Sequence, residues 1–164
     1  MYNAIMHISF YTDHFDEMMH FYVDQLGCRV KSVVRWKSYK GREDKPVFAK
    51  LAETDPEGIF YVYIEIAPGQ FIELFPSGPN QKPHRQWNED IGYSHFALTV
   101  DDIFAASAKL QENGITPDTQ ISKGPSGTYQ QWFHDPDGNK FELMQYTEQS
   151  WPVSYTHLTL PTIA

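Results

Sequence analysis

Residues 135–145 read DPDGNKFELMQ, a tight turn that runs directly into a strand. Asp, Pro, Gly and Asn favour the backbone angles that such a turn requires. After the turn, Phe141 and Leu143 flank the polar Glu142, which is the period of two expected of a strand with one apolar face. Together with the strand-like stretch 128–134 before the turn, the sequence predicts a β-hairpin over residues 128–146.

A strand and a helix precede this hairpin, and the same pair of elements begins the chain. Residues 93–100 alternate polar and apolar side chains, Asp101 can cap a helix after them, and a glycine stops that helix. In the first half, residues 3–11 form the matching strand, Asp13 the cap and Gly27 the stop. We interpret this order of strand, helix and glycine as an internal repeat.

Four more stretches of the first half are strand-like, and the last two flank a turn at residues 67–70. A βαβββ unit has three strands after its helix, so one of these four stretches is either an extra edge strand or an extended arm. The four stretches are residues 29–36, 47–51, 60–66 and 71–75.

We therefore predict an α+β fold of two tandem βαβββ modules. The first module spans residues 1–76, a linker rich in Pro, Gly and Asn spans 77–92, and the second module spans 93–147. Residues 148–164 are a tail. Within it, residues 153–162 (VSYTHLTLPT) resemble the translation of an adapter used in shotgun sequencing libraries, so they are left out of the fold prediction.

Composition and charge narrow the function classes. At 164 residues the chain can bury a core without disulfides, and its single cysteine, Cys28, is expected to be a buried, inert thiol. A formal net charge of −8 without a Lys/Arg cluster argues against nucleic acid as a partner. No apolar run approaches the roughly 20 residues that span a bilayer, and the start lacks a signal-peptide pattern. We expect no membrane partner and a cytoplasmic location.

Each repeat carries a His on its first strand and a Glu on its last strand. Strand parity places all of them on the sheet face opposite the apolar core. A lone His or Glu at such a position is usually a solvated polar residue, but repetition at equivalent positions favours a common site. Two imidazoles and two carboxylates without a thiolate predict a catalytic metal centre for one divalent Ni, Co, Zn, Mn or Fe ion. The predicted ligands are His7, Glu73, His95 and Glu142.

The same parity predicts which neighbouring side chains line a substrate pocket. They lie two or four positions from a predicted ligand and are partly aromatic, which suits a small-molecule substrate. Three further aromatic residues, Trp36, Tyr129 and Trp132, fit either this pocket or the core. The predicted pocket residues are Ser9, Tyr11, Phe71, Phe75, Tyr93, Ala97 and Met144.

Taken together, the repeated strand-His-helix-Gly order, FIELF (71–75), GYSHFALTVDDI (92–103) and DPDGNKFELMQ (135–145) resemble the vicinal oxygen chelate superfamily. The resemblance covers almost all of residues 2–146. It implies paired βαβββ modules that form a metal-lined cup, the glyoxalase fold. It also implies assembly as a homodimer, for which Tyr61 and Tyr63 offer exposed aromatic side chains.

Within the superfamily, the resemblance is to glyoxalase I, whose His/Glu/His/Glu ligand set matches His7, Glu73, His95 and Glu142. It implies that Glu142 is the catalytic base and that Glu73 is its counterpart and a possible second base. Methylmalonyl-CoA epimerases are similar but carry Gln at the position of Glu73. Glyoxalase I enzymes hold glutathione with an Arg and an Asn where this chain has Tyr11 and Ser77, so glutathione is not predicted as the substrate carrier.

The implied activity is that of a metal-dependent lyase or isomerase. Its substrate would be an α-hydroxy carbonyl or thiohemiacetal-like compound, whose enediolate is stabilised after a proton leaves carbon. Three alternatives stay open: a non-catalytic, bleomycin-resistance-like binding protein, an extradiol-type dioxygenase with two His and one carboxylate at iron, and an epimerase. The four-residue ligand set favours the lyase or isomerase, because a pure binder has no need of it.

Overall fold

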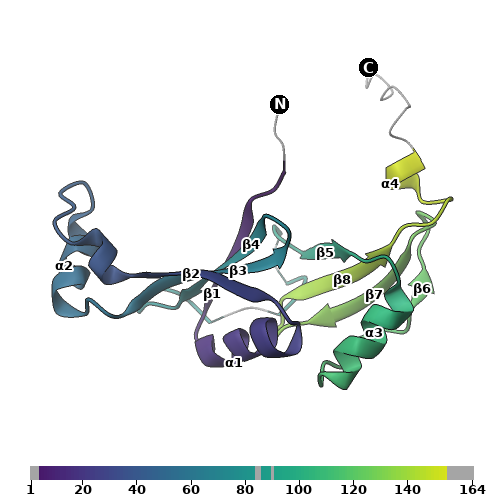
Figure 1. Ribbon diagram of the computed structural model, residues 1–164, viewed down its shortest axis with the longest axis horizontal. Coiled ribbons are helices and arrows are strands. Elements are labelled where there is room, and N and C mark those ends of the chain that lie inside the picture. Colours follow the sequence, from purple (N-terminus) through teal and green to yellow (C-terminus); the bar gives the residue numbers. More distant parts are fainter. Residues whose placement is uncertain (1–3, 84–85, 90, 155–164) are drawn as a thin grey trace, which may run out of the picture. The chain divides into compact units, whose positions relative to one another are not determined.

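The structure, a computed structural model, describes residues 4–83, 86–89 and 91–154. The chain divides into two compact units, residues 1–84 and 85–164. Each unit contains a four-stranded mixed sheet, with strand order β1-β4-β3-β2 in the first and β5-β8-β7-β6 in the second (Figure 1). Since the two orders correspond strand by strand, the predicted α+β class with two tandem modules is confirmed.

In the first unit, β1 (His7–Thr12) runs parallel to β4 (Gln70–Pro76). Strand β3 (Ile59–Ala67) is antiparallel to β4 and to β2 (Arg29–Arg35). The helix α1 (Phe15–Met19) continues as a π-helical segment, His20–Gln25, and covers one face of this sheet (Figure 1). Alternate residues of β3 and β4 are buried beneath this helix, as the strand pattern predicted. Together with two residues of the helical segment they form the core, which contains Met18, Tyr22, Val62, Ile64, Ile72 and Leu74.

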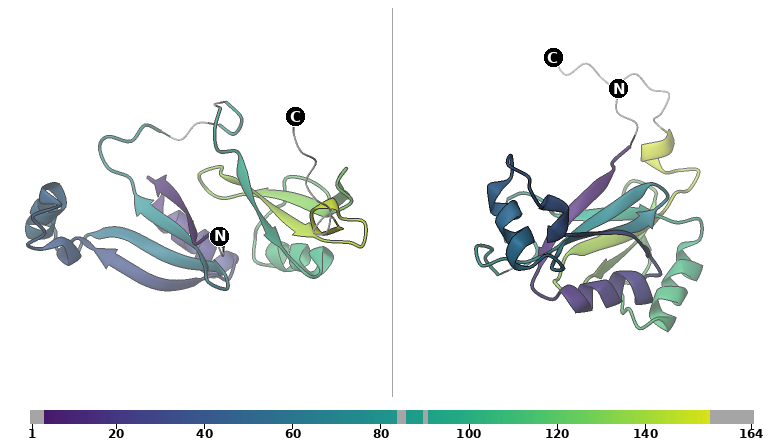
Figure 2. Two further views of the ribbon diagram at one scale, coloured as in Figure 1. Left: turned by 90° about the horizontal axis from the view of Figure 1, so that it is seen from above. Right: turned by 60° about the vertical axis from the view of Figure 1, so that its left-hand side comes forward.

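The first unit also has an extension between β2 and β3, made of the 3-10 helix η2 (Trp36–Tyr39) and α2 (Pro46–Thr54). The prediction of a strand at residues 47–51 is therefore wrong. Pro46 occupies the start of α2, where its missing N–H costs nothing, and residues 49–53 (AKLAE) are good helix formers. The extra element is helical, and Figure 2 shows it, in dark blue, beyond the end of the β2–β3 strands.

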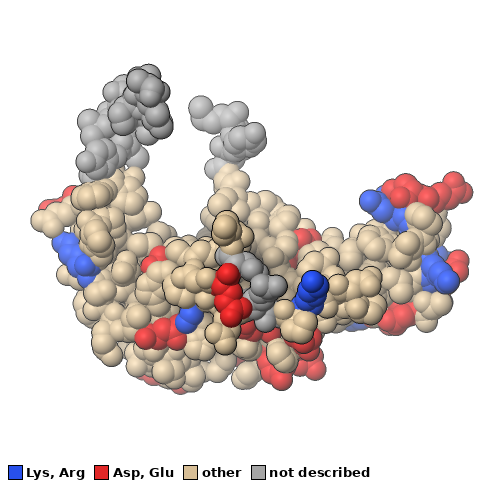
Figure 3. Space-filling model, turned by 180° about the vertical axis from the view of Figure 1, so that it is seen from behind, with Lys and Arg blue, Asp and Glu red and all other residues tan. Residues whose placement is uncertain are grey.

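The extension is closed at its base and held by aromatic rings. The N–H of Trp36 donates to the carbonyl of Gly58 at 3.0 Å, which returns the chain to the sheet. The Trp36 ring stacks on Phe60 at 4.5 Å, and Phe48 of α2 lies 5.0 Å from Phe60. On the surface of this extension, Lys and Arg lie among Asp and Glu (Figure 3), as in the Arg42–Asp44 ion pair at 2.8 Å.

In the second unit, β5 (His95–Thr99) runs parallel to β8 (Lys140–Gln145), which is antiparallel to β7 (Tyr129–His134). A two-residue strand, β6 (Ser122–Lys123), completes the sheet; the βαβββ order requires a strand here, but its position was not predicted. The helix α3 (Ile103–Glu112) contributes Ile103 and Leu110 to a core that contains Phe133, Phe141 and Leu143. The short helix α4 (Trp151–Ser154) follows the sheet.

The predicted turn at residues 135–139 is confirmed. One carboxylate oxygen of Asp135 accepts the N–H groups of Asp137 and Asn139, and Gly138 has the positive φ, +83°, that the turn requires. This turn sets the register in which Phe133 pairs with Phe141 and Trp132 with Glu142.

Both predicted helix stops are confirmed, but both predicted caps are wrong. Gly27 has a φ of +79°, in the left-handed region that follows many helices. At α1 the cap position is His14, without a side-chain cap, and not Asp13. At α3 the cap is Asp102, whose Oδ1 accepts the N–H groups of Phe104 and Ala105. The extended backbone of Asp102 directs its side chain back towards the first turn of the helix. The predicted cap, Asp101, lies one residue before this position.

Of the predicted adapter-derived segment, residues 155–162 lie outside the described residues. Among the residues that the structure does describe, there is no helix with the length and apolar character to cross a bilayer.

Candidate functional site

The first His–Glu pair lies on the two parallel strands of the first unit. In their register Ser9 stands opposite Glu73, with His7 two residues before Ser9 on the same face. Ile72 and Leu74, on either side of Glu73, are fully buried on the opposite face. The Nε2 atom of His7 is 3.4 Å from Oε2 of Glu73. The structure therefore brings together the two predicted ligands of this unit.

The second pair repeats this arrangement on β5 and β8. Ala97 stands opposite Glu142, and His95 precedes Ala97 by two residues. Nε2 of His95 is 3.4 Å from Oε2 of Glu142. The same two atoms are thus paired at the same distance, from equivalent strands, in each unit. Two unrelated polar pairs have no physical reason to agree in this way.

In both histidines the other ring nitrogen is engaged by the preceding residue. Nδ1 of His95 lies 3.0 Å from the hydroxyl oxygen of Ser94, and Nδ1 of His7 lies 2.8 Å from the sulfur of Met6. When Nδ1 carries the proton and donates it to these neighbours, Nε2 presents its lone pair on the side of the glutamate. Metal-bound histidines are oriented in this way by a partner at the second nitrogen. Imidazole Nε2 atoms beside carboxylates, with no thiolate among them, fit a divalent transition metal.

Glu73 is surrounded by hydroxyl groups. The hydroxyl of Ser9 donates to its Oε2 at 2.8 Å, and Tyr63, which stands opposite Glu73 on β3, donates its phenol hydroxyl to the same carboxylate. Burial raises the pKa of Tyr63 to about 12, with the hydrogen bond to Glu73 and the negative charge of that residue acting in the same direction. Tyr63 therefore stays protonated and remains a donor at any physiological pH.

Glu142 has different neighbours. Trp132 stands opposite it on β7, and the Trp132 ring lies 4.6 Å from the ring of His95. The Glu142 side chain is only 9% exposed, and burial raises its pKa above the ordinary value for a glutamate, although His95 beside it acts to lower that pKa. A carboxylate in this setting holds a proton more readily than an exposed one.

The predicted pocket residues divide between the two units. In the first, the predicted residues Ser9, Tyr11, Phe71 and Phe75 share the sheet face of His7 and Glu73, and the rings of Tyr11 and Phe75 are 5.0 Å apart. In the second, Ala97 and Met144 lie on β5 and β8, while Tyr93 precedes β5 and is exposed.

Sequence reasoning assigned Tyr63 to assembly and missed its contact with Glu73. The Tyr63 ring is 5.8 Å from the ring of His7 and 5.7 Å from that of Phe71, so it belongs to the site. Counting back along the β3–β4 hairpin from the Ala67–Gln70 pair at its turn places Ile64, and not Tyr63, opposite Glu73. A bulge at residues 65–67 shifts that count by one residue and hides the match.

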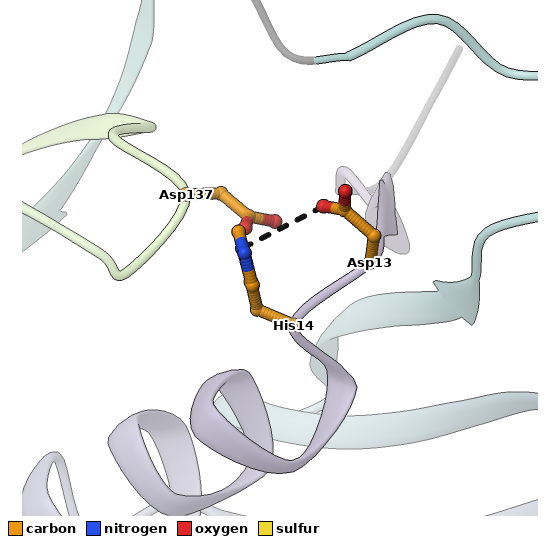
Figure 4. Close-up of side chains that lie close together, drawn as sticks. All are labelled: Asp13, His14 and Asp137. Atoms are coloured by element: carbon orange, nitrogen blue, oxygen red, sulfur yellow. Dashed lines mark ion pairs between the residues drawn. The ribbon is translucent and has the colours of Figure 1, made fainter.

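A different His–carboxylate pair stands at the start of α1, where Nδ1 of His14 is 3.6 Å from Oδ1 of Asp13 (Figure 4). Asp137, also drawn there, belongs to the β7–β8 turn of the second unit. The side chains of His14 and Asp13 are both more than half exposed. Solvent screens such a pair, and we assign it no function.

The family model of the Glyoxalase/Bleomycin resistance protein/Dioxygenase superfamily matches residues 4–143, and the chain belongs to this superfamily. The resemblance to the superfamily, predicted from the motifs, is thereby confirmed. No curated protein is significantly similar to the chain in sequence.

Solved structures with this fold include proteins of different activity. A glyoxalase family protein from Enterococcus faecalis is 24% identical, with a TM-score of 0.63 over 87% of this chain and 98% of that one. Lactoylglutathione lyase from Agrobacterium tumefaciens is 21% identical, with a TM-score of 0.55 over 87% and 92%. TnmS3, an antibiotic binding protein from Streptomyces sp. CB03234, is 21% identical, with a TM-score of 0.59 over 89% and 98%. At these identities the likeness shows the fold alone.

Proposed function

We propose that the protein binds one divalent metal ion through His7, Glu73, His95 and Glu142 and is a metal-dependent lyase or isomerase. The observation that supports this most is the repetition of a His–Glu pair, with the same Nε2–Oε2 distance of 3.4 Å in both units. An ion held by these four side chains would supply Lewis acidity for the negative charge that develops on two neighbouring substrate oxygens. The substrate class is a small α-hydroxy carbonyl or thiohemiacetal-like compound.

In this proposal Glu142 is the base. A proton moves from the substrate carbon to the Glu142 carboxylate, and the electrons of the C–H bond pass to the carbonyl group. The proton then returns to the adjacent carbon and the hydroxyl proton passes from one substrate oxygen to the other, so the reaction is an isomerisation that consumes no co-reactant. The buried surroundings that raise the pKa of Glu142 favour proton uptake by this residue. The aromatic face formed by Tyr11, Phe71 and Phe75 would orient the substrate and exclude water.

A second candidate is a binding protein without catalysis, and the aromatic rings of the first unit favour it. Phe75 contacts the rings of Tyr11, Tyr61 and Phe60 at 5.0–5.3 Å, a surface suited to a flat apolar ligand. TnmS3, which shares the fold, is described as an antibiotic binding protein. Such a binder has no need for two matched His–Glu pairs, so the enzyme is the better-supported proposal.

Metal content tests the proposal directly. The chain would be purified without chelator, reconstituted with Ni, Co, Mn, Fe or Zn, and analysed for metal by mass spectrometry. We expect one ion per chain in the parent and in the control His20→Ala, whose exposed imidazole pairs with Asp24. His95→Ala should lose affinity steeply, because a ligand is removed. A metal content near zero for the parent with all five metals would refute the proposal.

Homodimer formation and a cytoplasmic location remain predictions. Light scattering over a range of protein concentrations tests the first, and fractionation of the source cells tests the second. A monomer mass at micromolar and higher concentrations would refute the homodimer.

A further inference from the structure

The two His–Glu pairs match, but the residues on either side of each glutamate do not. In the first unit, Glu73 stands between Ser9 on β1 and Tyr63 on β3. In the second, Glu142 stands between Ala97 on β5 and Trp132 on β7. Because strand order and register are equivalent, these are corresponding positions. The repeat therefore has hydroxyl groups beside one glutamate and none at the same positions beside the other.

The hydroxyls of Ser9 and Tyr63 restrain Glu73 from both neighbouring strands. Ser9 donates at 2.8 Å to the oxygen that also faces His7, and Tyr63 donates from the other side. Tyr63 is itself fixed, since its ring packs against Phe71 and lies 5.2 Å from the ring of Tyr61. Two hydrogen bonds to one ionised carboxylate are strong and directional, so they hold the side chain in a single orientation.

Ala97 and Trp132 carry no hydroxyl group that could restrain Glu142 in this way. Ala97 offers only a methyl group, and the ring of Trp132 lies tilted beside His95, with the two ring centres 4.6 Å apart. A carboxylate that alternates between a metal and a substrate carbon has to rotate and to give up its partners. Neighbours without hydroxyl groups allow this movement, whereas donors on both sides oppose it.

We propose that Ser9 and Tyr63 are positioning residues that keep Glu73 a permanent metal ligand, while Ala97 and Trp132 leave Glu142 free to serve as the base. This inference rests on the proposed metal-dependent function. It goes beyond that function because it names the neighbouring residues that make two equivalent glutamates differ in role.

The test exchanges the neighbours of the two glutamates. Ser9→Ala and Tyr63→Phe remove one donor each from Glu73, and Ser9→Thr keeps the hydroxyl. Ala97→Ser installs a hydroxyl at the corresponding position beside Glu142. Matched controls on the second unit are Ser122→Ala, on the exposed strand β6, and Tyr146→Phe, which is exposed just after β8.

Two readouts concern the metal, and one concerns the base. The first two are the Co(II) dissociation constant and the visible absorption spectrum of bound Co(II), which reports ligand geometry. The third is the rate of solvent-deuterium exchange into hydroxyacetone. Ser9→Ala and Tyr63→Phe should weaken Co(II) binding by about 10-fold each and alter the spectrum, as loss of a group that orients a metal ligand does. Ser9→Thr and both controls should match the parent.

Ala97→Ser should have the opposite effect on the metal and a separate effect on exchange. Its new hydroxyl should tighten Co(II) binding by about 10-fold and slow any exchange by a similar factor, because Glu142 becomes held as Glu73 is. This variant removes no packing group, so it carries the test even if Ser9→Ala fails to fold.

Parent-like Co(II) constants and spectra for Ser9→Ala and Tyr63→Phe would overturn the inference while leaving the metal site in place. Looser Co(II) binding in Ala97→Ser would do the same. A parent that binds no metal would instead remove the proposed function, and this inference with it.

Discussion

Glu142→Gln is the change that most directly tests the proposed role of Glu142 as the base. Gln is nearly isosteric with Glu, keeps an oxygen that can face His95 and the metal, and loses the ability to accept a proton from carbon. The side chain is only 9% exposed, so water cannot easily reach the site to replace it as the acceptor. General base catalysis contributes at least about 10²-fold, equivalent to roughly 2.7 kcal/mol of barrier, and we expect a loss of this size.

The assay is solvent-deuterium exchange into an α-hydroxy carbonyl compound bound to the metal-loaded protein, with metal content measured in parallel. Glu73→Gln is the matched control, because it makes the same chemical change at the corresponding position. It should reduce exchange by less than about 10-fold, since an amide oxygen can still accept the hydroxyls of Ser9 and Tyr63. Exchange by Glu142→Gln at the parent rate would refute the assignment and make Glu73 the base.

Three further predictions concern the protein outside the two His–Glu pairs. Burial raises the pKa of Cys28 to about 11, so its thiol should react with iodoacetamide at pH 8 about 100-fold more slowly than an unperturbed one. Because folding raises this pKa, the contribution of Cys28 to the free energy of unfolding should be complete below pH 9 and should be lost as the pH rises towards 11. Measuring the free energy of unfolding of the parent and of Cys28→Ala across this pH range tests this. Asp102→Ala should lower the free energy of unfolding by about 1 kcal/mol through loss of the α3 cap, whereas Asp101→Ala should change it by less than about 0.5 kcal/mol in urea titrations. Phe141→Ala should cost about 3–5 kcal/mol in the same measurement, since this ring is fully buried and stacks on two others.

The arrangement of the sheets and the His–Glu pairs could be predicted because both follow from local patterns. Alternation along FIELF and FELMQ determines which face each glutamate occupies, and the repeated order of elements places His7 and His95 on matching strands. These signals span a few residues each, and the glycine stops at the helix ends limit the alternatives. Strand parity and the internal repeat together therefore located both pairs.

Other features depend on information that a short pattern does not contain. Residues 47–51 are apolar enough for a strand or a helix, and only the proline before them and the alanines Ala49 and Ala52 favour the helix that forms. The role of Tyr63 depends on the exact pairing of β3 with β4, which a bulge displaces by one residue. Cap positions depend on the backbone angles of a single residue, so Asp102 could not be distinguished from its neighbour.

The closed base of the extension has a consequence for how this protein can diversify. Because the hydrogen bond from Trp36 to Gly58 rejoins the chain at the ends of β2 and β3, residues 37–57 form an insert whose removal or lengthening leaves the pairing of β1 with β4 untouched. The entropy of closing a loop grows only slowly with its length, about 0.6 kcal/mol for each doubling. An evolving gene can thus lengthen, trim or replace this segment at little cost in stability, and mutations that accumulate there leave His7 and Glu73 in register. We expect homologues to differ most in this insert and least in the strands that carry the two pairs.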